Sequence, residues 1–596
     1  MAKKLQAINY TSRDFATIRR DLENFTKRYY SNTYKDFNEA SFGSLMLDTV
    51  AYIGDILSFY VDYQANESFL ETAIEYNNVV RLCRQLGFKL NPNPSSYGVV
   101  TLYIKVPASV STMGPDLNYV PTLQAGSEFS SEAGGFYTLL DDVDFKKQQN
   151  QIVVSDATTA GAPTHFVIRA QGRATSGRVG RDKFTIGDFE RFRRLPLSIS
   201  KVNNIVSVYD LAGHRYYEVD HLSQNIIYKA VRNTTATRAT VPNILKPFPV
   251  PRRFTVDFVD GQTVLQFGYG SDSQLTSDAV TNPANLMLDM TGRDYVTDVG
   301  FDPNNLMNTD KFGIAPSNTE LIVAYRYNTT TDVNAPVNSI TKVNRPKLVF
   351  ERESVLDSKK RGGVVTSVQV VNEEQFVGSV SLPNSEEIKQ RAYGFFATQN
   401  RAVTAEDYKS ICYAMPAKFG SIKRVSIARD FDAFKRNLNL YVISENMSGK
   451  LTIPNATLKN NLKNWISQYK MINDTVDILN AKIVNFGIEF EISIDLSANK
   501  FNVLNLASRA LGKKFGQTYD IGEPILISDV NRVLNKVEGI LDVVSVKIVE
   551  KSGTTYGGDS YDFNANRSAD SRRILAQENV IFELKFPGND IKGSVI

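Results

Sequence analysis

The stretch LMLDTVAYIGDILSFYV, residues Leu45 to Val61, is long and apolar enough to resemble a membrane span, yet it contains Asp48 and Asp55. A transmembrane helix needs about 20 mostly apolar residues, and an aspartate at the bilayer centre costs roughly 2.5–3.5 kcal/mol. Two such charges oppose insertion. The stretch therefore predicts a helix of a water-soluble protein and no membrane span.

Asp48, Asp55 and Asp62 recur every seven positions. They would lie on one stripe, because an α-helix drifts only about 20° per heptad. Successive carboxylates would be about 10.5 Å apart along the axis, so they cannot jointly bind one metal ion. The rest of the helix, from Leu45 to Leu70, is apolar over most of its circumference, more than a helix on a single core needs. Two interpretations stay open: an interior helix whose aspartates face water, or a bundle facing a partner.

The 596-residue chain is too long for one hydrophobic core, so several domains are expected. Its 42% hydrophobic and 22% charged residues are typical of soluble globular proteins, and a net charge of +4 predicts no general affinity for nucleic acid or membranes. Cys83 and Cys412 fall in different predicted domains, which fits a reducing compartment. The N-terminal MAKKLQAINYTSRDF lacks the apolar segment of a secretory signal, so we expect folding in a cytoplasm.

The order of patterns predicts a multidomain α+β protein with an N-terminal helical domain, a β-rich middle domain and small C-terminal α+β sandwich domains. Short β-branched and aromatic runs such as GVVTLYIKV and QIVVSD define the middle, and strands flanking single helices follow it. The predicted units are a helical bundle-forming domain at 1–95, the β-rich domain with insertions at 96–375, a helical segment at 376–420, a first small α+β domain at 421–485, and a second with a C-terminal tail at 486–596.

Motifs for common chemistry are missing from the sequence. There is no Cys-x-x-Cys, His-Glu-x-x-His or Gly-x-Ser-x-Gly, and the odd separation of His214 and His221 does not suit zinc. GRATSGRV, from Gly172 to Val179, has the spacing of a phosphate loop, but Arg178 replaces its lysine and Val179 its metal-binding hydroxyl, which favours a chance match. We therefore predict no enzyme, with no catalytic residue, cofactor, metal site or small-molecule substrate.

A basic segment from Arg169 to Arg194 is the one region whose charge could neutralise phosphates. We favour a solvated loop, or pairing with an acidic neighbouring subunit, over nucleic-acid binding. Its basic residues are Arg169, Arg173, Arg178, Arg181, Lys183, Arg191, Arg193 and Arg194.

The stretch FFATQNRAVTAEDYKSICYAM, from Phe395 to Met415, resembles the signature of the baseplate J-like family of contractile-tailed phages and related injection machines. Thr404 can cap the helix that follows, with Asp407 at its third position in a capping-box-like arrangement. The residues that carry the motif are Asn400, Arg401, Ala402, Val403, Thr404 and Asp407.

Other stretches resemble the same family in the same order, including AGSEFSSEAGGFYTLLDD, LQFGYGSD and IGEPILISDVNRVLNKVEGILDVVSVKI. The N-terminal segment from FGSLMLDTV to NPNPSSYG looks like the form found in the T4-type baseplate wedge subunit. One departure is an insertion after FGYGSDS, where residues 274–313 precede IAPSNTELIVAYRY.

The resemblance implies a non-enzymatic structural wedge subunit of the virion tail baseplate, assembled in the host cytoplasm. Such a subunit self-associates in dimer and ring contacts around the sixfold tail axis, binds other wedge proteins, and rearranges on infection. In T4-type relatives the N-terminal helices join a bundle with other wedge proteins, and the C-terminal domains pair copies of the subunit. The resemblance thus favours the bundle interpretation, with packing expected from Leu45, Val50, Ile53, Leu57, Phe59 and Leu70.

The alternative is a receptor-binding or carbohydrate-degrading tail protein. The Thr- and Asn-rich loops of the middle domain favour it. Against it stand the long helical N-terminal part and the mixed C-terminal part. The single tryptophan, Trp465, falls on a predicted helix, whereas sugar sites often stack on aromatic side chains.

Overall fold

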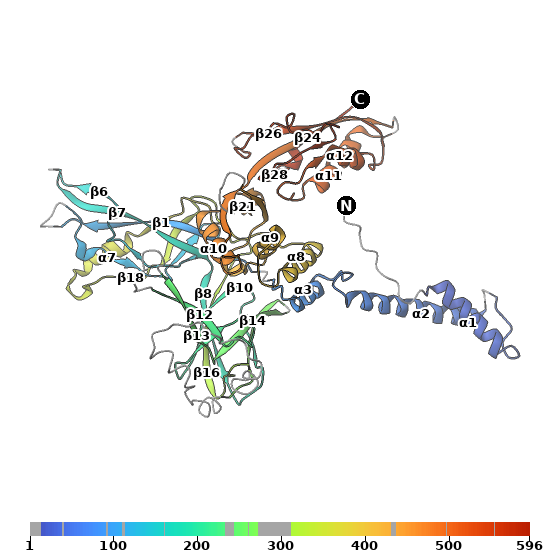
Figure 1. Ribbon diagram of the computed structural model, residues 1–596, viewed down its shortest axis with the longest axis horizontal. Helices are drawn as coiled ribbons and strands as arrows, with labels where there is room; N and C mark the ends of the chain where they lie inside the picture. The colour runs from blue at the N-terminus through green and yellow to red at the C-terminus, as the bar shows by residue number, and fades with distance from the viewer. Residues whose placement is uncertain are drawn as a thin grey trace.

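The predicted fold class is confirmed in the computed structural model: a helical N-terminal region precedes a β-rich middle and a mixed C-terminal part (Figure 1). The insertion predicted after FGYGSDS lies almost entirely outside the described residues. Those residues are 13–38, 41–90, 93–109, 114–159, 161–232, 243–259, 261–271, 312–430, 437–495, 498–553 and 555–596.

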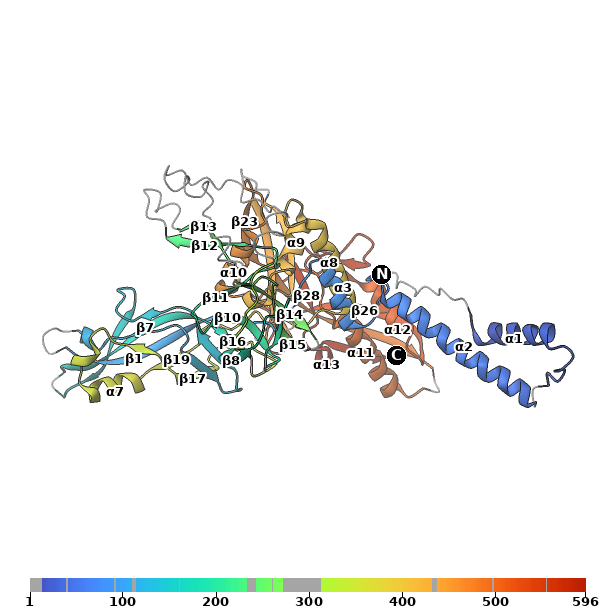
Figure 2. The ribbon, with the colours of Figure 1, turned by 90° about the horizontal axis from the view of Figure 1, so that it is seen from below.

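Three helices form the N-terminal region: α1 (Phe15–Tyr29), α2 (Phe42–Glu67) and α3 (Tyr76–Gln85). Asp14 caps α1, accepting a hydrogen bond from Thr17 N at 2.9 Å, and Ser41 caps α2 through Ser44 N at 3.1 Å. The α1–α2 pair folds back on itself and projects from the body as an arm, whereas α3 packs on α8 of the body (Figure 2).

The first large sheet has seven strands in the order β17-β3-β4-β7-β1-β19, with β6 paired to β7. Helix α7 (Ser358–Thr366) packs on it, and Val364 of that helix joins Ile104 and Ile168 in one buried cluster. The strands are β1 (Tyr97–Pro107), β3 (Glu128–Ser131), β4 (Phe136–Leu139), β6 (Gln151–Ala157), β7 (Pro163–Ser176), β17 (Ile340–Arg345) and β19 (Gln369–Val371).

The second large sheet, with its own core around Val208, Phe254 and Tyr325, has the order β8-β16-β10-β11-β14-β15-β9. Its strands are β8 (Arg178–Ile186), β9 (Arg194–Pro196), β10 (Val202–Asp210), β11 (Arg215–Glu218), β14 (Arg253–Val259), β15 (Gln262–Phe267) and β16 (Thr319–Tyr327).

The chain passes from the first sheet to the second at Gly177, between β7 and β8. Gly177 has φ 105°, and a Cβ there would lie 2.7 Å from Arg326 Cγ, so only glycine fits without displacement. A phosphate loop instead runs from a strand into a helix. The strand–glycine–strand path therefore agrees with a chance match for GRATSGRV.

The remaining elements of the middle and the helical segment are short. They are the hairpin of β12 (Ile226–Arg232) with β13 (Asn243–Pro249), the small sheet of β2 (Thr122–Leu123), β5 (Val143–Asp144) and β18 (Leu348–Val349), and the 3-10 helices η1 (Leu117–Tyr119), η4 (Glu353–Val355) and η5 (Ala417–Phe419).

Helices α8 (Ser385–Thr398) and α9 (Ala405–Tyr413) lead into a mixed sheet in which β23 runs parallel to β21. Leu440 and Val442 of β21 pack against Leu458 and Leu462 of α10 (Ala456–Ile466), as the predicted small α+β unit requires. The strands are β20 (Arg424–Arg429), β21 (Asn437–Glu445), β22 (Leu451–Thr452) and β23 (Thr475–Asn480).

The last unit is a second mixed sheet, in the order β26-β24-β28 with β29 also on β24. Phe486 and Ile488 of β24 pack with Ala507 and Leu511 of α11. The elements are β24 (Lys482–Ile494), α11 (Lys500–Phe515), β25 (Ile525–Leu526), α12 (Ile527–Leu534), β26 (Ile540–Lys551), β27 (Arg573–Ile574), β28 (Val580–Glu583), α13 (Pro587–Asp590) and β29 (Ile591–Val595).

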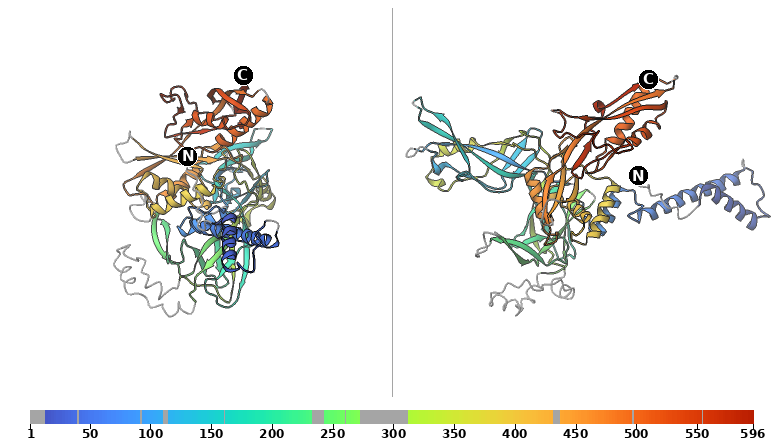
Figure 3. Two further views of the ribbon diagram at one scale, coloured as in Figure 1. Left: turned by 90° about the vertical axis from the view of Figure 1, so that its right-hand side faces the viewer. Right: turned by 45° about the horizontal axis from the view of Figure 1, so that its top comes forward.

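The units radiate from a common centre. In Figure 1 the α1–α2 arm lies at one end and β6 and β7 at the other, with the second large sheet below and the C-terminal unit above. The two views of Figure 3 show the same separation of the arm from the rest of the chain. The arm thus presents most of its surface away from the chain's own cores.

Candidate functional site

The contact between α1 and α2 uses the least apolar stripe of α2. Ser44, Ala51 and Ser58 recur every seven residues and are buried. Arg19 of α1 forms an ion pair with Asp48, with Nε and Oδ1 at 2.7 Å, and its Nη2 donates to Ser44 Oγ at 3.3 Å. The predicted aspartate stripe therefore lies along the α1 contact, with Asp48 facing Arg19 rather than open water.

Small side chains let the two helices approach closely. Ala51 is fully buried, and a Cβ added to Gly54 would lie 3.2 Å from Ile18 Cδ1. Ser58 Oγ donates to the carbonyl of Arg13 at 3.2 Å. Alanine, glycine and serine bury little apolar area, so this hairpin leaves the large side chains of α2 unused.

The large apolar side chains of α2 face away from the chain. Five residues predicted to pack in a bundle are between 48% and 64% exposed. They are Leu45, Val50, Ile53, Leu57 and Phe59, and they share the surface with Phe42, Met46, Tyr52, Tyr60 and Val61. Soluble monomers rarely leave a continuous apolar surface of this kind uncovered.

Leu70, the sixth residue predicted for bundle packing, lies elsewhere. Helix α2 ends at Glu67, and Leu70 packs beside Ala73, Val79 and Ile388 in a cluster that joins α3 to α8. It therefore belongs to the chain's own core at the base of the arm.

Glu67 holds the turn between α2 and α3. Its Oε1 accepts hydrogen bonds from Ile74 N at 2.7 Å and Glu75 N at 3.2 Å, and its Oε2 accepts one from Asn78 at 2.8 Å. Burial opposes the charge, but these hydrogen bonds and Lys389 outweigh it and lower the pKa of Glu67. The ionised carboxylate therefore pins the arm to the body.

By length and composition alone, α2 could cross a membrane. An 18-residue window of the helix has a mean hydropathy of 1.3, and 11% of that window is buried. The ion pair of Asp48 with Arg19 lies on this helix, and a charge in hydrocarbon is costly.

The family motif forms a turn between α8 and α9. Gln399 and Asn400 have φ of 47° and 61°, and the fully buried Ala402 donates its N–H to Tyr469 O at 2.9 Å. The predicted capping box is confirmed: Thr404 Oγ1 accepts from Asp407 N at 3.2 Å, and Asp407 Oδ2 accepts from Thr404 N at 2.8 Å. These residues set the path of the chain.

The remaining motif residues flank that turn. Arg401 is exposed and donates its N–H to Thr398 O at 3.1 Å, and Val403 is exposed. Burial opposes the Asp407 carboxylate, but the N–H groups of Thr404 and Val403 outweigh it and lower the pKa of Asp407. The motif thus works locally, as a helix start.

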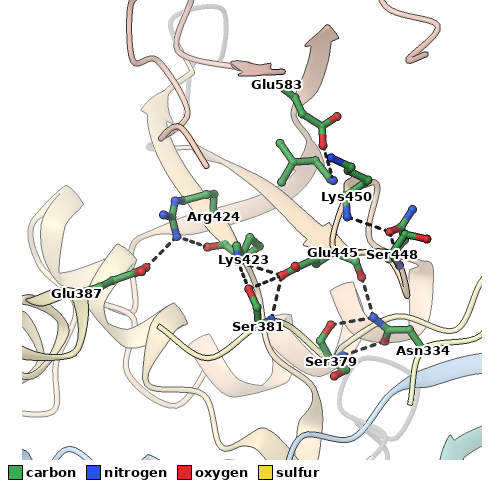
Figure 4. Close-up of polar contacts among 12 residues, drawn as sticks. Asn334, Ser379, Ser381, Glu387, Lys423, Arg424, Glu445, Ser448, Lys450 and Glu583 are labelled. Atoms are coloured by element: carbon green, nitrogen blue, oxygen red, sulfur yellow. Dashed lines mark hydrogen bonds and ion pairs between the residues drawn. The ribbon is translucent and has the colours of Figure 1, made fainter. Parts of the chain in front are cut away.

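A polar joint connects the β-rich middle to the first small α+β unit (Figure 4). The buried Asn334 donates to Ser379 O and Glu445 O, both at 2.8 Å. The Glu445 carboxylate accepts from Ser381 N at 2.9 Å and pairs with Lys423 Nζ at 3.0 Å. The side chains of Asn334, from the β-rich middle, and of Glu445, from the first small unit, thereby both have hydrogen-bond or ion-pair partners at the joint.

Arg424 connects the joint to Glu387 of α8, as Figure 4 shows, and also to the last unit. Its Nη1 lies 2.8 Å from Glu387 of α8, and its Nε lies 2.7 Å from the exposed Asp520 that follows α11. Burial opposes ionisation of Glu387, but Arg391 and Arg424 outweigh it and lower its pKa. Glu583 of β28 accepts from Leu451 N at 2.9 Å. A buried apolar cluster that includes Ile443, Leu451, Ile483 and Ile581 lies between the same two units.

A cavity of ≈ 570 Å³ lies beside the joint, between the helices α8 to α10 and the strands β10 and β11. Phe88, Ile205 and Phe395 line it together with Asn400 and Trp465. Sequence reasoning missed this cavity, because its walls come from segments far apart in the chain. Trp465 donates Nε1–H to Ile411 O at 2.8 Å and packs on Tyr469, and both rings line the cavity.

The basic segment from Arg169 to Arg194 is mainly two strands, β7 and β8, rather than the solvated loop that we expected. Most of its cations pair with acidic residues of the same chain, which lowers the charge available to a phosphate backbone. The ion pairs are Arg169–Glu373, Arg173–Asp141, Arg178–Glu128, Lys183–Glu320 and Arg193–Glu190.

The two cysteines and His214 lie in the fold as structural residues. Cys83 and Cys412 are buried, and burial raises the pKa of the Cys83 thiol to about 11. His214 Nδ1 lies 3.0 Å from Asp210 Oδ2. Within the described ranges, no group of three or more His, Cys, Asp or Glu is placed to hold a metal ion.

A comparison with curated protein sequences found no match. Among solved structures, the anti-feeding prophage baseplate is 9% identical, with a TM-score of 0.26 over 94% of this chain and 90% of that one. The TssK-TssF-TssG baseplate subcomplex of the type VI secretion system is 8% identical, with a TM-score of 0.23 over 74% of this chain and 96% of that one. TM-scores this low do not establish a shared fold. Residues 14–85, which contain α1, α2 and α3, match the family model of the bacteriophage baseplate protein, N-terminal domain.

Proposed function

We propose that this chain is a non-enzymatic wedge subunit of a contractile phage tail baseplate, located in the virion tail and assembled in the host cytoplasm. Its arm binds helices of other baseplate proteins in a bundle, and copies of the chain associate with one another. The match of residues 14–85 to a baseplate N-terminal domain supports this role.

The observation that carries the proposal is that the two faces of α2 have different contacts. Its serine, alanine and aspartate stripe contacts α1, while Leu45, Ile53 and Leu57 are left exposed. Helices that pack around such a face bury it through knobs-into-holes contacts, and obligate interfaces are rich in apolar surface of this kind. The arm is therefore built to be completed by another chain.

The joint supports the mechanical part of the role. The β-rich middle meets the first small unit through the hydrogen bond of Asn334 to Glu445, and Arg424 joins that unit to the last one beside a small apolar cluster. Interfaces that are small and polar allow domains to move relative to one another. When the baseplate rearranges on infection, rotation at this joint would change the angle between the β-rich units and the C-terminal unit.

Leu57→Asp tests the arm. Co-expressed with the other baseplate proteins of its particle, the Leu57→Asp chain should lose co-purification with them, because a buried unpaired carboxylate opposes helix packing. Leu382→Asp is the matched control, since Leu382 is a similarly exposed leucine on the body. Equal co-purification of both variants would rule out the bundle.

A vesicle flotation assay separates the protein partner from a membrane. The full chain should stay with the soluble fraction in the presence of phosphatidylcholine vesicles, and of vesicles that also contain anionic lipid. Flotation that Leu57→Asp abolishes would instead assign α2 to a lipid surface and contradict the proposed bundle.

A further inference from the structure

The cavity of ≈ 570 Å³ beside the joint has no role in the proposed function. Its size lies within the range of about 300–1,000 Å³ that is usual for small-molecule sites. Its walls come from the chain that follows α3, from the second large sheet and from the helices α8 to α10, and Figure 1 shows these parts close together at the centre of the molecule. A ligand in the cavity would contact all three parts at once.

Two aromatic rings form one wall of the cavity. The ring centroids of Trp465 and Tyr469 are 4.9 Å apart, and the two planes are tilted by 59°. Trp465 Nε1–H donates to Ile411 O at 2.8 Å, and the carbonyl of Tyr469 accepts from the N–H of Ala402, in the family motif, at 2.9 Å. These hydrogen bonds fix the indole, and the backbone that carries the phenol, before any ligand binds.

Other walls of the cavity are apolar. The rings of Phe88 and Phe395 meet edge to face, with centroids 6.2 Å apart, and Ile205 and Val256 of the second large sheet also line the cavity. The apolar body of a ligand is stabilised in such surroundings, because its surface is removed from water.

The charges on the walls favour a cation over an anion. Lys418 is neutralised by Glu218 at 2.9 Å, and Lys89 Nζ donates to the carbonyl of Asp220 at 2.5 Å. Within the described ranges, the Asp220 carboxylate itself has neither an ion pair nor a hydrogen bond. Burial and this carboxylate raise the pKa of Tyr469 to about 12, so the negative charge acts on the aromatic wall. The lining residues that can titrate are Lys89, Glu218, Asp220, His221, Lys418 and Tyr469.

We propose that this cavity binds a small organic cation with an apolar body. The ammonium group lies between the Asp220 carboxylate and the faces of Trp465 and Tyr469, and the body lies against Phe88 and Phe395. The negative face of an aromatic ring attracts a cation, as the carboxylate does, whereas an anion is repelled by both. This site goes beyond the proposed function, and it involves binding without a chemical step.

A titration of the full chain with three probes of equal shape tests the proposal. Phenethylammonium, 2-phenylethanol and 3-phenylpropanoate share one apolar body and carry a positive charge, no charge and a negative charge. Trp465 is the only tryptophan of the chain, so the intrinsic fluorescence reports on this wall. The cation should bind about 3–10-fold more tightly than the alcohol, and the anion should bind most weakly. Saturating phenethylammonium should also raise the unfolding temperature, because only the folded chain has the cavity.

Asp220→Asn should weaken phenethylammonium binding by about 2–5-fold and leave 2-phenylethanol binding unchanged, because the side chain is exposed and only its charge is removed. The matched control is Asp332→Asn, at an exposed aspartate that does not line the cavity, and it should keep all three affinities. Lys89→Gln removes a competing cation and should tighten phenethylammonium binding.

Equal affinities for the cation and the anion would overturn the proposal, and so would the absence of both a fluorescence response and a change in unfolding temperature. An Asp220→Asn chain that discriminates among the probes as the natural chain does would also overturn it. Tighter binding of 3-phenylpropanoate would assign the cavity to an anion held by Lys89. None of these outcomes involves α2, so the bundle is tested separately by Leu57→Asp.

Discussion

At the scale of single residues, one carboxylate fixes the turn at the base of the arm, next to the apolar cluster that contains Leu70 and Ile388. Glu67 is 8% exposed and accepts hydrogen bonds from Ile74 N, Glu75 N and Asn78. A carboxylate at the start of α3 also meets the positive end of the helix dipole. The angle at which α2 leaves the body is therefore set by an ionised group, whose loss would free the base of the arm.

Replacing Glu67 with glutamine should weaken this turn by about 1–3 kcal/mol, because charged hydrogen bonds are lost at a buried site. Hydrogen exchange of the Ile74 and Glu75 amides measures it. Glu71→Gln is the control, since Glu71 is a nearby exposed glutamate. Faster exchange in both variants alike would contradict a special role for Glu67.

The same group predicts a dependence on pH. The pKa of Glu67 is lowered from 4.5 on folding, so its contribution is fully present above 4.5 and is lost as the pH falls through the lower folded pKa. The difference in exchange between the natural chain and Glu67→Gln should therefore shrink below pH 4.5. A difference that is constant with pH would show that shape, and not charge, holds the turn.

At the scale of elements, the α1–α2 hairpin inverts the usual arrangement of an amphipathic helix. The small and polar stripe of α2 is inside, and the apolar face is outside. Close helix approach through Ala51 and Gly54 makes this possible. The hairpin is correspondingly sensitive to side-chain size on that stripe.

Ala51→Leu should destabilise the hairpin by roughly 1–3 kcal/mol, because the contact with α1 has no room for the added atoms. Hydrogen exchange of the α1 amides in the full chain should accelerate. Val50→Leu, one position away on the exposed face, should change exchange little. Acceleration by Val50→Leu and not by Ala51→Leu would reverse the assigned faces.

At the scale of the whole molecule, stability is divided among separate cores joined by polar contacts. Each large sheet has its own buried cluster, and so does each small α+β unit. The joint adds hydrogen bonds and ion pairs, whose geometry fixes orientation more than it adds affinity, and a small apolar cluster lies between the two α+β units.

Arg424→Gln should loosen the last unit, because Glu387 and Asp520 both lose their shared cation. The distance distribution between spin labels at Val337→Cys and Leu541→Cys should broaden. Arg361→Gln is the control, since the Arg361–Glu353 ion pair lies within one unit and is exposed. Equal distributions in the two variants would assign the rigidity of the joint to other contacts.

Local patterns were sufficient for the class and order of the elements. The runs GVVTLYIKV, QIVVSD and ELIVAYRY became β1, β6 and β16, and the Thr404–Asp407 capping box starts α9 as predicted. These features depend on neighbours within a few residues, which the sequence contains directly. The sequence also showed that α2 is apolar over most of its circumference, which is more apolar surface than contact with a single core would bury.

Only the tertiary structure decided where those elements meet. It placed Asp48 against Arg19, and it placed Leu70 in the core of α3 and α8. It paired Arg169 with Glu373, 204 positions away, and brought Asn334 to Glu445. Long-range pairings of this kind depend on loop closure and on which sheet edges remain free, and the pattern of a single segment carries information about neither.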